Sequence, residues 1–397
     1  MQSRGDTTLD CGSGVIYDNP QPTTMPLMNI TVPSYVTEAL EQLTHYGYHA
    51  YVVGGCVRDS LLGREPADWD VCTNATPEEM LMAFRRYRVF KTGLKHGTLT
   101  VRVRGNSVEV TTFRTDGAYT DNRHPDAVSF VTRVEDDLAR RDFTINAMAY
   151  HPAQGIVDAF GGQEDLAARV LRCVGEPDVR FNEDGLRLLR ALRFAARFCF
   201  AIERETAYSI HRNRHLLENI SAERIFKELQ GILVAPGVGD MLVGFPDVFV
   251  QIAPELAPLL DTMCGEESQW ARTARVVCAA SPIFSLRLAL LLHELERPVE
   301  AAKGILSRLK SDNATAQVVT TLLAAAREPL PTGRPAMRRL YGKLGRDGVE
   351  LLFSMRRAML AGAAEPEAEE RALRRALPGG RGSGAAQQLC VPAALPY

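Results

Sequence analysis

The segment from residue 50 to residue 71, AYVVGGCVRDSLLGREPADWDV, constrains the fold more than any other part of the chain. Its apolar start, AYVV, is typical of a short buried strand. The next two residues, Gly54 and Gly55, permit a tight turn into a helix that begins within CVRDSLLG. Asp68 and Asp70 follow about a dozen residues later, separated by one tryptophan. The segment therefore predicts a strand, a glycine turn, a helix and a second strand that carries two carboxylates.

The two aspartates are candidate metal ligands. Side chains at positions i and i+2 of a strand project from one face, so Asp68 and Asp70 are expected side by side, with Trp69 turned into the core. Two carboxylates this close repel each other unless a cation lies between them. Oxygen ligands of this kind suit Mg²⁺, which completes its shell with water and phosphate oxygens. Glu109, on the alternating run VEVTTFR, is a candidate third carboxylate.

The glycine turn is a candidate phosphate site. Gly54 and Gly55 let the backbone approach a phosphate closely, and the following helix N-terminus carries a partial positive charge. Arg58, on the first turn of that helix, is placed to reach the same phosphates. Taken alone, a pair of glycines is more often a simple turn and D-x-D is more often a solvated loop. Their combination within 22 residues favours a site for a metal and a phosphate.

The chain divides into a mixed first part and a helical second part. Helical spacing in PSYVTEALEQLTHYGY, a capping box at Thr76 and Glu79, and a hairpin pattern around Gly105 and Asn106 predict an α+β domain with a small sheet. Beyond about Asp165 helical patterns dominate and no strand pair is expected. The predicted domains are a disordered extension at 1–27, an α+β head at 28–164, a helical neck at 165–235, a helical body at 236–345, and a partial helical tail with a low-complexity end at 346–397.

Composition excludes several classes of protein. At 397 residues with 46% hydrophobic and 24% charged residues, the chain is typical of a multi-domain globular protein. No run of apolar residues is long enough to span a membrane. The eight cysteines form no C-x-x-C pair, which argues against a zinc site or a disulfide framework and favours a cytoplasmic location. The net charge of −2 does not exclude nucleic acid, because local basic faces can exist within a neutral total.

One such basic face is expected in the segment EDGLRLLRALRFAAR. Asp184, Arg187, Arg190, Arg193 and Arg197 recur at spacings of three or four, so they lie on one side of a helix. Ion pairing along a solvated face is the ordinary explanation of such a stripe. Here four arginines face one nearby aspartate, and the excess positive charge predicts an anionic ligand.

Five motifs in order resemble the class II tRNA nucleotidyltransferases, the bacterial CCA-adding enzymes and their poly(A) polymerase relatives. These are the GG…D-x-D segment, RRDFTINAMAY (140–150), DAFGG (158–162), EDGLRLLRALRF (183–194) and SAERIFKEL (221–229). The resemblance implies a polymerase β-like head followed by an all-α neck, body and tail. It implies Mg²⁺ held by Asp68 and Asp70, with Glu109 beside them. It also implies nucleotide contacts by Gly54, Gly55, Arg58, Arg141, Asp142, Asn146, Asp184, Arg187, Arg190 and Arg193.

The implied reaction is template-independent addition of CCA to the 3′ end of tRNA, with CTP and ATP as substrates and pyrophosphate as product. Cytosine and adenine both present an exocyclic amine beside an unprotonated ring nitrogen, so Asp184 can accept from the amine while Arg187 donates to the nitrogen. Uracil and guanine present the opposite pattern, and each unpaired group costs about 1–3 kcal/mol.

Other interpretations of the sequence stay open. The stretch TGLKHGTLTVRV (92–103) favours the tRNA-specific branch over poly(A) polymerase, and residues 114–130 resemble a flexible loop of members that add the terminal A. An enzyme that adds only A, or a tRNA-binding protein without activity, remains an alternative. The sequence does not decide between a monomer and a homodimer. His293 and Glu294 occupy the place of an HD phosphohydrolase motif in some relatives, but a packing role is expected.

Overall fold

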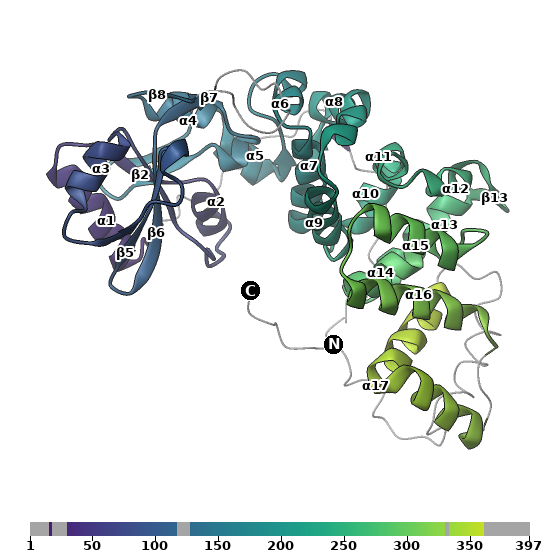
Figure 1. Cartoon of the computed structure of the whole chain (residues 1–397). Coiled ribbons are helices and arrows are strands. Elements are labelled where there is room, and N and C mark those ends of the chain that lie inside the picture. Colours follow the sequence, from purple (N-terminus) through teal and green to yellow (C-terminus); the bar gives the residue numbers. More distant parts are fainter. Residues whose placement is uncertain (1–15, 18–29, 117–127, 330–332, 361–397) are drawn as a thin grey trace, which may run out of the picture. The chain divides into compact units, whose positions relative to one another are not determined.

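The computed structural model describes residues 16–17, 30–116, 128–329 and 333–360. Contacts divide the chain into two compact units, residues 1–257 and 258–397. Figure 1 follows the chain from the purple helices and blue strands of the first unit to the yellow-green α17 (Arg334–Met359) of the second. Most of the predicted N-terminal extension, the loop tip at 117–127 and the low-complexity end lie outside the described residues.

A seven-stranded mixed sheet forms the centre of the first part of the described chain. In sheet order its strands are β10 (Gly155–Val157), β9 (Ala149–His151), β2 (Ala50–Val53), β3 (Asp70–Thr73), β6 (Asn106–Thr112), β5 (Thr98–Val103) and β4 (Arg88–Phe90). β3 and β6 run parallel, whereas the other neighbours in the sheet are antiparallel. This sheet confirms the predicted α+β head.

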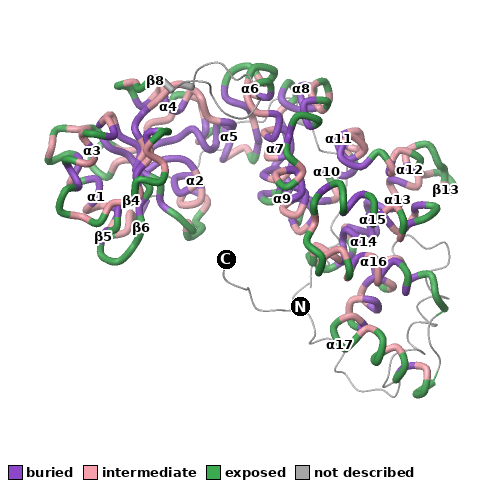
Figure 2. The backbone as a smooth tube through the Cα atoms, in the orientation of Figure 1, coloured by how far each residue is buried: buried purple, intermediate pink, exposed green. Residues whose placement is uncertain are grey.

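Helix α1 (Ser34–His45) covers one face of the sheet, and residues of α4 (Val134–Ala139) pack on the other. The region also contains α2 (Gly55–Leu61) and α3 (Pro77–Ala83), with 3-10 turns η1 (Leu94–His96) and η2 (Thr144–Asn146). α1 buries Val36, Ala39, Leu40 and Leu43 and contacts β2, β3, β5 and β6. The opposite face bears a second apolar cluster that includes Tyr51, Cys72 and Leu138. Buried segments accordingly concentrate in the central strands (Figure 2).

Two local predictions are confirmed, one of them with different turn residues. The capping box at Thr76 and Glu79 is confirmed, since each side chain bonds the other residue's backbone N–H. The hairpin is confirmed too, but its turn residues are Arg104 and Gly105, both with positive φ, because Asn106 already pairs with Val103. A second small hairpin joins β7 (Arg114–Asp116) and β8 (Val128–Phe130).

Helices dominate the remainder of the first unit. They are α5 (Gly162–Ala168), α6 (Pro177–Glu183), α7 (Leu186–Phe198), α8 (Arg204–Asn213), α9 (Ala222–Leu233), α10 (Val238–Gly244) and α11 (Pro246–Ile252), with 3-10 turns η3 (Arg214–Asn219) and η4 (Pro254–Leu256). α7 packs on α9 and α10, and its Leu188, Leu192 and Ala196 are fully buried. Residues 165–235, predicted as a helical neck, are mostly helical.

The expectation of no strand pairs beyond Asp165 was wrong. β11 (Val170–Leu171) and β1 (Ile16–Tyr17) both pair in parallel with β12 (Ala201–Glu203), and β13 (Met263–Cys264) pairs with β14 (Glu267–Ser268). These strands are two or three residues long, so none of them shows the alternation that identifies a strand in sequence.

The second unit is a helical bundle. Its helices are α12 (Pro258–Asp261), α13 (Gln269–Ala279), α14 (Phe284–Leu292), α15 (Pro298–Arg308), α16 (Asn313–Arg327) and α17. α14 is buried from Leu286 to Leu292 and contacts α13, α15, α16 and α17, which makes it the central helix. α17 bends at Gly345, where φ is 69° and ψ is 179°.

Candidate active site

The glycine turn after β2 is held against the η2 region. Gly54 has φ 80° and ψ −125°, and its N–H donates to the carbonyl of Met148 at 3.0 Å. A Cβ at Gly54 would lie 2.7 Å from Nη1 of Arg141. Glycine is therefore required twice, for the backbone conformation and for the close approach of the Arg141 guanidinium.

Substitution of Gly54 by alanine is expected to raise the KM for a phosphate-bearing substrate about tenfold by displacing Arg141. The backbone strain costs on the order of 1–3 kcal/mol. Gly105→Ala is the matched control, because Gly105 has φ 84° and nothing within 4 Å of its Cβ position. Steady-state kinetics with that substrate varied measure the effect. Equal KM values for Gly54→Ala and Gly105→Ala would contradict a role for the close approach of the Arg141 guanidinium to Gly54.

The carboxylates predicted on one strand lie at its start. β3 begins at Asp70, and Asp68 lies in the irregular segment before it, which corrects the prediction that both belong to a strand. The reason is that β2 pairs with β3 only as far as Val52 and Val71, and the chain turns away at Gly54. Asp70 is in register with Glu109 on the parallel strand β6, so their side chains project from the same face.

Negative charge gathers at this point of the sheet. The pKa of Asp70 is raised to about 6, first because the protein desolvates its carboxylate and then because Asp68 and Glu109 add negative charge. Arg141 acts in the opposite direction and lowers it. Asp70 therefore interacts electrostatically with Asp68, Glu109 and Arg141.

The carboxylates of Asp68 and Asp70 suit a Mg²⁺ ion that has only one or two protein ligands. Within the described residues, no group of three His, Cys, Asp or Glu side chains is arranged to hold a metal ion. Mg²⁺ is usually bound through only one or two carboxylates, with water and phosphate oxygens in the other positions. Asp68 and Asp70 match that pattern, and their mutual repulsion is what a divalent cation would relieve.

Arg141 lies between the glycine turn and the carboxylates. Its Nη2 is 3.4 Å from Oδ2 of Asp137, one turn earlier in the chain. Its Nε is buried and has no hydrogen-bond partner within the described part of the chain. A buried N–H without a partner is costly, so this guanidinium is suited to an additional anionic ligand.

A chain of hydrogen bonds joins α2 to the neck. Nη1 of Arg58 donates to Oδ1 of Asn146, and Nδ2 of Asn146 donates to Oδ1 of Asp142 at 3.0 Å. Arg190 on α7 donates to Oδ2 of Asp142 from Nε at 2.9 Å and from Nη2 at 2.5 Å. Burial alone would raise the pKa of Asp142, but the charge of Arg190 and the bonds from Asn146 and Arg190 lower it to about 2. Four of the predicted site residues therefore form one connected network.

The residues expected to select the base already have partners in the protein. Asp184 lies between α6 and α7 rather than on α7, and its Oδ1 accepts from the N–H of Leu186 at 3.0 Å. Its Oδ2 accepts from Nη2 of Arg224 on α9 at 2.7 Å. Arg187 pairs with Glu183 at 2.5 Å and donates to the carbonyl of Arg140 at 3.2 Å.

The predicted excess of positive charge on α7 was largely wrong. Arg187 pairs with Glu183, Arg190 with Asp142, and Arg193 with Glu228 on α9. Asp142 and Glu228 are 48 and 35 residues away in sequence from their partners, so helical spacing could not reveal them. Only Arg197 of the stripe makes no ion pair with the described residues.

Comparison with known proteins identifies the family. A model of the poly A polymerase head domain matches residues 50–172, and one described as a probable RNA and SrmB-binding site of polymerase A matches 199–242. The CCA-adding enzyme of Geobacillus thermodenitrificans is 40% identical over 297 residues, which cover 73% of this chain and 70% of that protein. The chain belongs to the CCA-adding enzyme family. A Lactobacillus delbrueckii member is 38% identical over 75% of this chain and 74% of its own length.

Other CCA-adding enzymes match over a shorter span or by fold alone. The one from Geobacillus kaustophilus is 46% identical, but the match covers about half of each protein, 51% and 50%. The crystal structure of the Bacillus stearothermophilus CCA-adding enzyme in complex with CTP aligns with a TM-score of 0.66 and 32% identity, over 86% of this chain and 81% of that one. The Thermotoga maritima CCA-adding enzyme complexed with tRNA, at 21% identity and a TM-score of 0.59, shows the shared fold.

This CCA-adding family member has a polar cluster where some relatives carry an HD motif. Glu294 accepts from Gln269 at 2.7 Å and from Arg272 at 2.6 Å, and Nε2 of His293 lies 3.2 Å from its Oε1. These bonds, led by that of His293, lower the pKa of Glu294 to about 2 although burial opposes the shift. Glu294 joins α14 to α13, which supports the packing role.

Replacing Glu294 with Gln is expected to lower the stability of the second unit by about 1–3 kcal/mol, because buried donors lose a charged acceptor. The wild-type contribution is complete above the unfolded pKa of about 4.3 and is lost as pH falls toward 2. Urea unfolding at pH 7 and pH 3 measures both effects. Metal-dependent phosphohydrolase activity that disappears in the variant would contradict the packing role.

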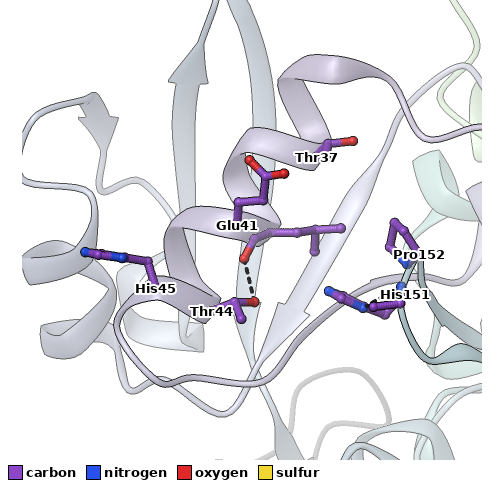
Figure 3. Close-up of a pocket in the computed structure, with 8 residues that line it drawn as sticks. Thr37, Glu41, Thr44, His45, His151 and Pro152 are labelled. Carbon is purple, nitrogen blue, oxygen red and sulfur yellow. Dashed lines mark hydrogen bonds between the residues drawn. The ribbon is translucent and has the colours of Figure 1, made fainter.

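A pocket elsewhere in the head takes no part in this arrangement. It has a volume of about 380 Å³ and lies between α1 and the turn after β9, lined by Thr37, Leu40, Glu41, Thr44, His45, His151, Pro152 and Ala153. Figure 3 shows that His45 points away from His151, so the pocket does not bring these imidazoles together. None of the predicted nucleotide or metal residues lines it.

Proposed function

We propose that this protein adds C, C and A to the 3′ end of tRNA without a template, from CTP and ATP, in a Mg²⁺-dependent reaction that releases pyrophosphate. The observation that carries the proposal is the meeting of Asp68, Asp70 and Glu109 with Arg141 and the Gly54 turn at one end of the sheet. Membership of the CCA-adding family supports the substrates. In the described residues no helix is long and apolar enough to cross a membrane.

The proposed chemistry is an in-line displacement at phosphorus. The 3′-hydroxyl oxygen of the RNA forms a bond to the α-phosphorus of the nucleotide, and the bond from that phosphorus to the bridging oxygen breaks. Pyrophosphate leaves with the electron pair, and the hydroxyl proton passes to water. Mg²⁺ held by Asp68 and Asp70 would lower the pKa of the hydroxyl and neutralise charge on the phosphates. Arg141 and the backbone at Gly54 and Gly55 hold and orient the triphosphate.

Base selection is proposed at the start of α7. Asp184 would accept from the exocyclic amine of cytosine or adenine, while Arg187 donates to the neighbouring ring nitrogen. In the structure these groups pair with Arg224 and Glu183. The base therefore has to replace both ion pairs, so a base with the wrong pattern leaves two charged groups without partners.

The remaining predicted residues act around the sugar and phosphates. Asp142 and Asn146 are proposed to orient Arg58 through their hydrogen bonds, and Arg190 fixes Asp142 to the neck. Arg193 is proposed to set the position of α7 on α9, since it pairs with Glu228 and packs against Gly231.

Incubation of the protein with three tRNAs, ending before the first C, after C and after CC, tests the proposal. Each is given CTP, ATP or both, with Mg²⁺, beside an unstructured RNA. The expected result is CCA on the first tRNA with both nucleotides, and addition that stops at CC with CTP alone.

Each rival function gives a different result. An enzyme that adds only A extends the tRNA ending in CC and no other. A poly(A) polymerase extends the unstructured RNA with a long run of A. A binding protein without activity retains tRNA and incorporates neither nucleotide. Any of these three outcomes would overturn the proposal.

A further inference from the structure

Three guanidinium groups surround one phenylalanine ring at the end of α7. The Cζ atoms of Arg58, Arg64 and Arg197 lie 4.8, 5.1 and 5.5 Å from the centroid of the Phe198 ring. Arg58 belongs to α2, Arg64 to the loop that follows α2, and Arg197 to α7 itself. Cation–π contacts place each guanidinium against the ring but do not neutralise its charge.

Carboxylates balance only one of these charges. Arg58 is buried and pairs with Asp59 at 2.8 Å. Arg64 and Arg197 are exposed, and neither makes an ion pair with any residue that the structure describes. The pKa of Arg58 is lowered, chiefly by burial and also by the positive charge of Arg197, so the like charges act on one another. This part of the surface therefore carries an uncompensated positive charge that an anion would stabilise.

A polar pocket adjoins Arg64. It has a volume of about 640 Å³, and Arg64 lines it together with Glu65 and the hydroxyl side chains of Ser60 and Tyr35. Ala67 and Trp69, which flank Asp68 in sequence, also line it. The pocket thus borders the loop that carries a proposed metal ligand.

The proposed triphosphate site lies at the other end of α2. Gly54 precedes the first residue of this seven-residue helix, and Arg64 follows its last turn. At 1.5 Å per residue, about 10 Å of helix separates the two ends. Between them the guanidinium of Arg58 is buried. Arg64 and Arg197 are therefore available to a second polyanion besides the triphosphate. The RNA is such a polyanion, because in-line displacement requires it to approach opposite the departing pyrophosphate.

We propose that Arg64 and Arg197 bind a backbone phosphate of the RNA substrate close to its 3′ end. The inference rests on the proposed function, which identifies the RNA as tRNA. It adds the part of the protein surface that binds this RNA. Phe198 holds the two guanidinium groups at fixed positions, so less side-chain entropy is lost when the phosphate binds.

Binding of tRNA by the full-length protein, measured by fluorescence anisotropy over a range of salt concentrations, tests the site. The variants are Arg64→Gln, Arg197→Gln and the double variant. The slope of log affinity against log salt is expected to fall by about 0.7–0.9 for each phosphate that the variant no longer neutralises, and affinity at low salt by about fivefold. KM for CTP is expected to be unchanged.

Arg85→Gln is the matched control. Arg85 is also exposed, stacks over the Tyr46 ring at 5.7 Å and has no ion pair within the described residues. It lies beside the C-terminal end of α1, since Tyr46 caps that helix. The control is expected to keep the wild-type slope. Arg64→Lys and Arg197→Lys retain the charge and are expected to keep most of the slope, which separates the effect of charge from an effect on folding.

Two results would overturn the inference. One is a double variant whose slope equals that of Arg85→Gln. The other is a raised KM for CTP with unchanged tRNA binding, which would assign the two arginines to the triphosphate. A wild-type protein that adds no nucleotide to tRNA would refute the proposed function. The salt dependence of tRNA binding would still show whether Arg64 and Arg197 bind a phosphate, because that experiment measures binding and not activity.

Discussion

Replacing Asp70 with Asn is expected to reduce incorporation of CMP into tRNA on the order of a thousandfold, with little loss of folding. Asp70 stands at the start of β3 in register with Glu109, and its pKa is raised first by desolvation and then by the negative charges of Asp68 and Glu109. The loss of one carboxylate removes a metal ligand, and charge stabilisation by a bound metal contributes several kcal/mol to such a transition state. Single-turnover incorporation of labelled CTP measures the chemical step directly.

Glu78→Gln is the control for this prediction. Glu78 is exposed on α3, a helix that packs with α1 rather than with the carboxylates. The control is expected to retain wild-type incorporation. An Asp70→Asn protein that kept more than about a tenth of the wild-type rate would remove Asp70 from the catalytic residues.

Replacing Asp142 with Ala is expected to lower the free energy of unfolding by about 3 kcal/mol. Asp142 is buried and accepts from Arg190 and Asn146, so its removal leaves a charge and an amide without their partner. The value is at the lower end for buried pairs because the Arg190 side chain is 35% exposed. Urea unfolding of the full-length protein measures it. Glu135→Gln, which breaks the exposed pair with Arg133, is expected to cost under about 1 kcal/mol.

The Asp142 contribution also depends on pH in a defined direction. Its folded pKa of about 2 lies below the unfolded value of about 3.9, so the stabilisation is complete above pH 4. It is lost as pH falls from about 4 to 2, and the difference between wild type and variant narrows over that interval. A difference that stays constant from pH 7 to pH 2 would contradict the assigned pair.

Local patterns predicted the elements that carry the candidate carboxylates well. Gly54, the start of α2 and the alternation of β5 and β6 depend on neighbouring residues, and they occur where the sequence places them. The register of Asp70 with Glu109 shows that two separate runs bring their carboxylates to one face of neighbouring central strands. The prediction that Asp68 lies on a strand was wrong, because the first residue of β3 depends on where β2 stops pairing with it.

Contacts between distant segments could not be predicted from spacing. Glu228 and Asp142 neutralise arginines of α7 from other elements, and the sequence offers no periodicity that joins them. The two- and three-residue strands β11 and β12 are too short to alternate. The same limit applies to the positive site at Phe198, since Arg64 and Arg197 are far apart in sequence and meet only in the fold.

A diffraction experiment on crystals grown with CTP and Mn²⁺ in place of Mg²⁺ tests the central claim most directly. The account predicts an anomalous peak about 2 Å from carboxylate oxygens of Asp68 and Asp70, beside the phosphates of the nucleotide. A nucleotide bound with its phosphates remote from these two side chains, or a metal peak coordinated by other residues, would contradict it.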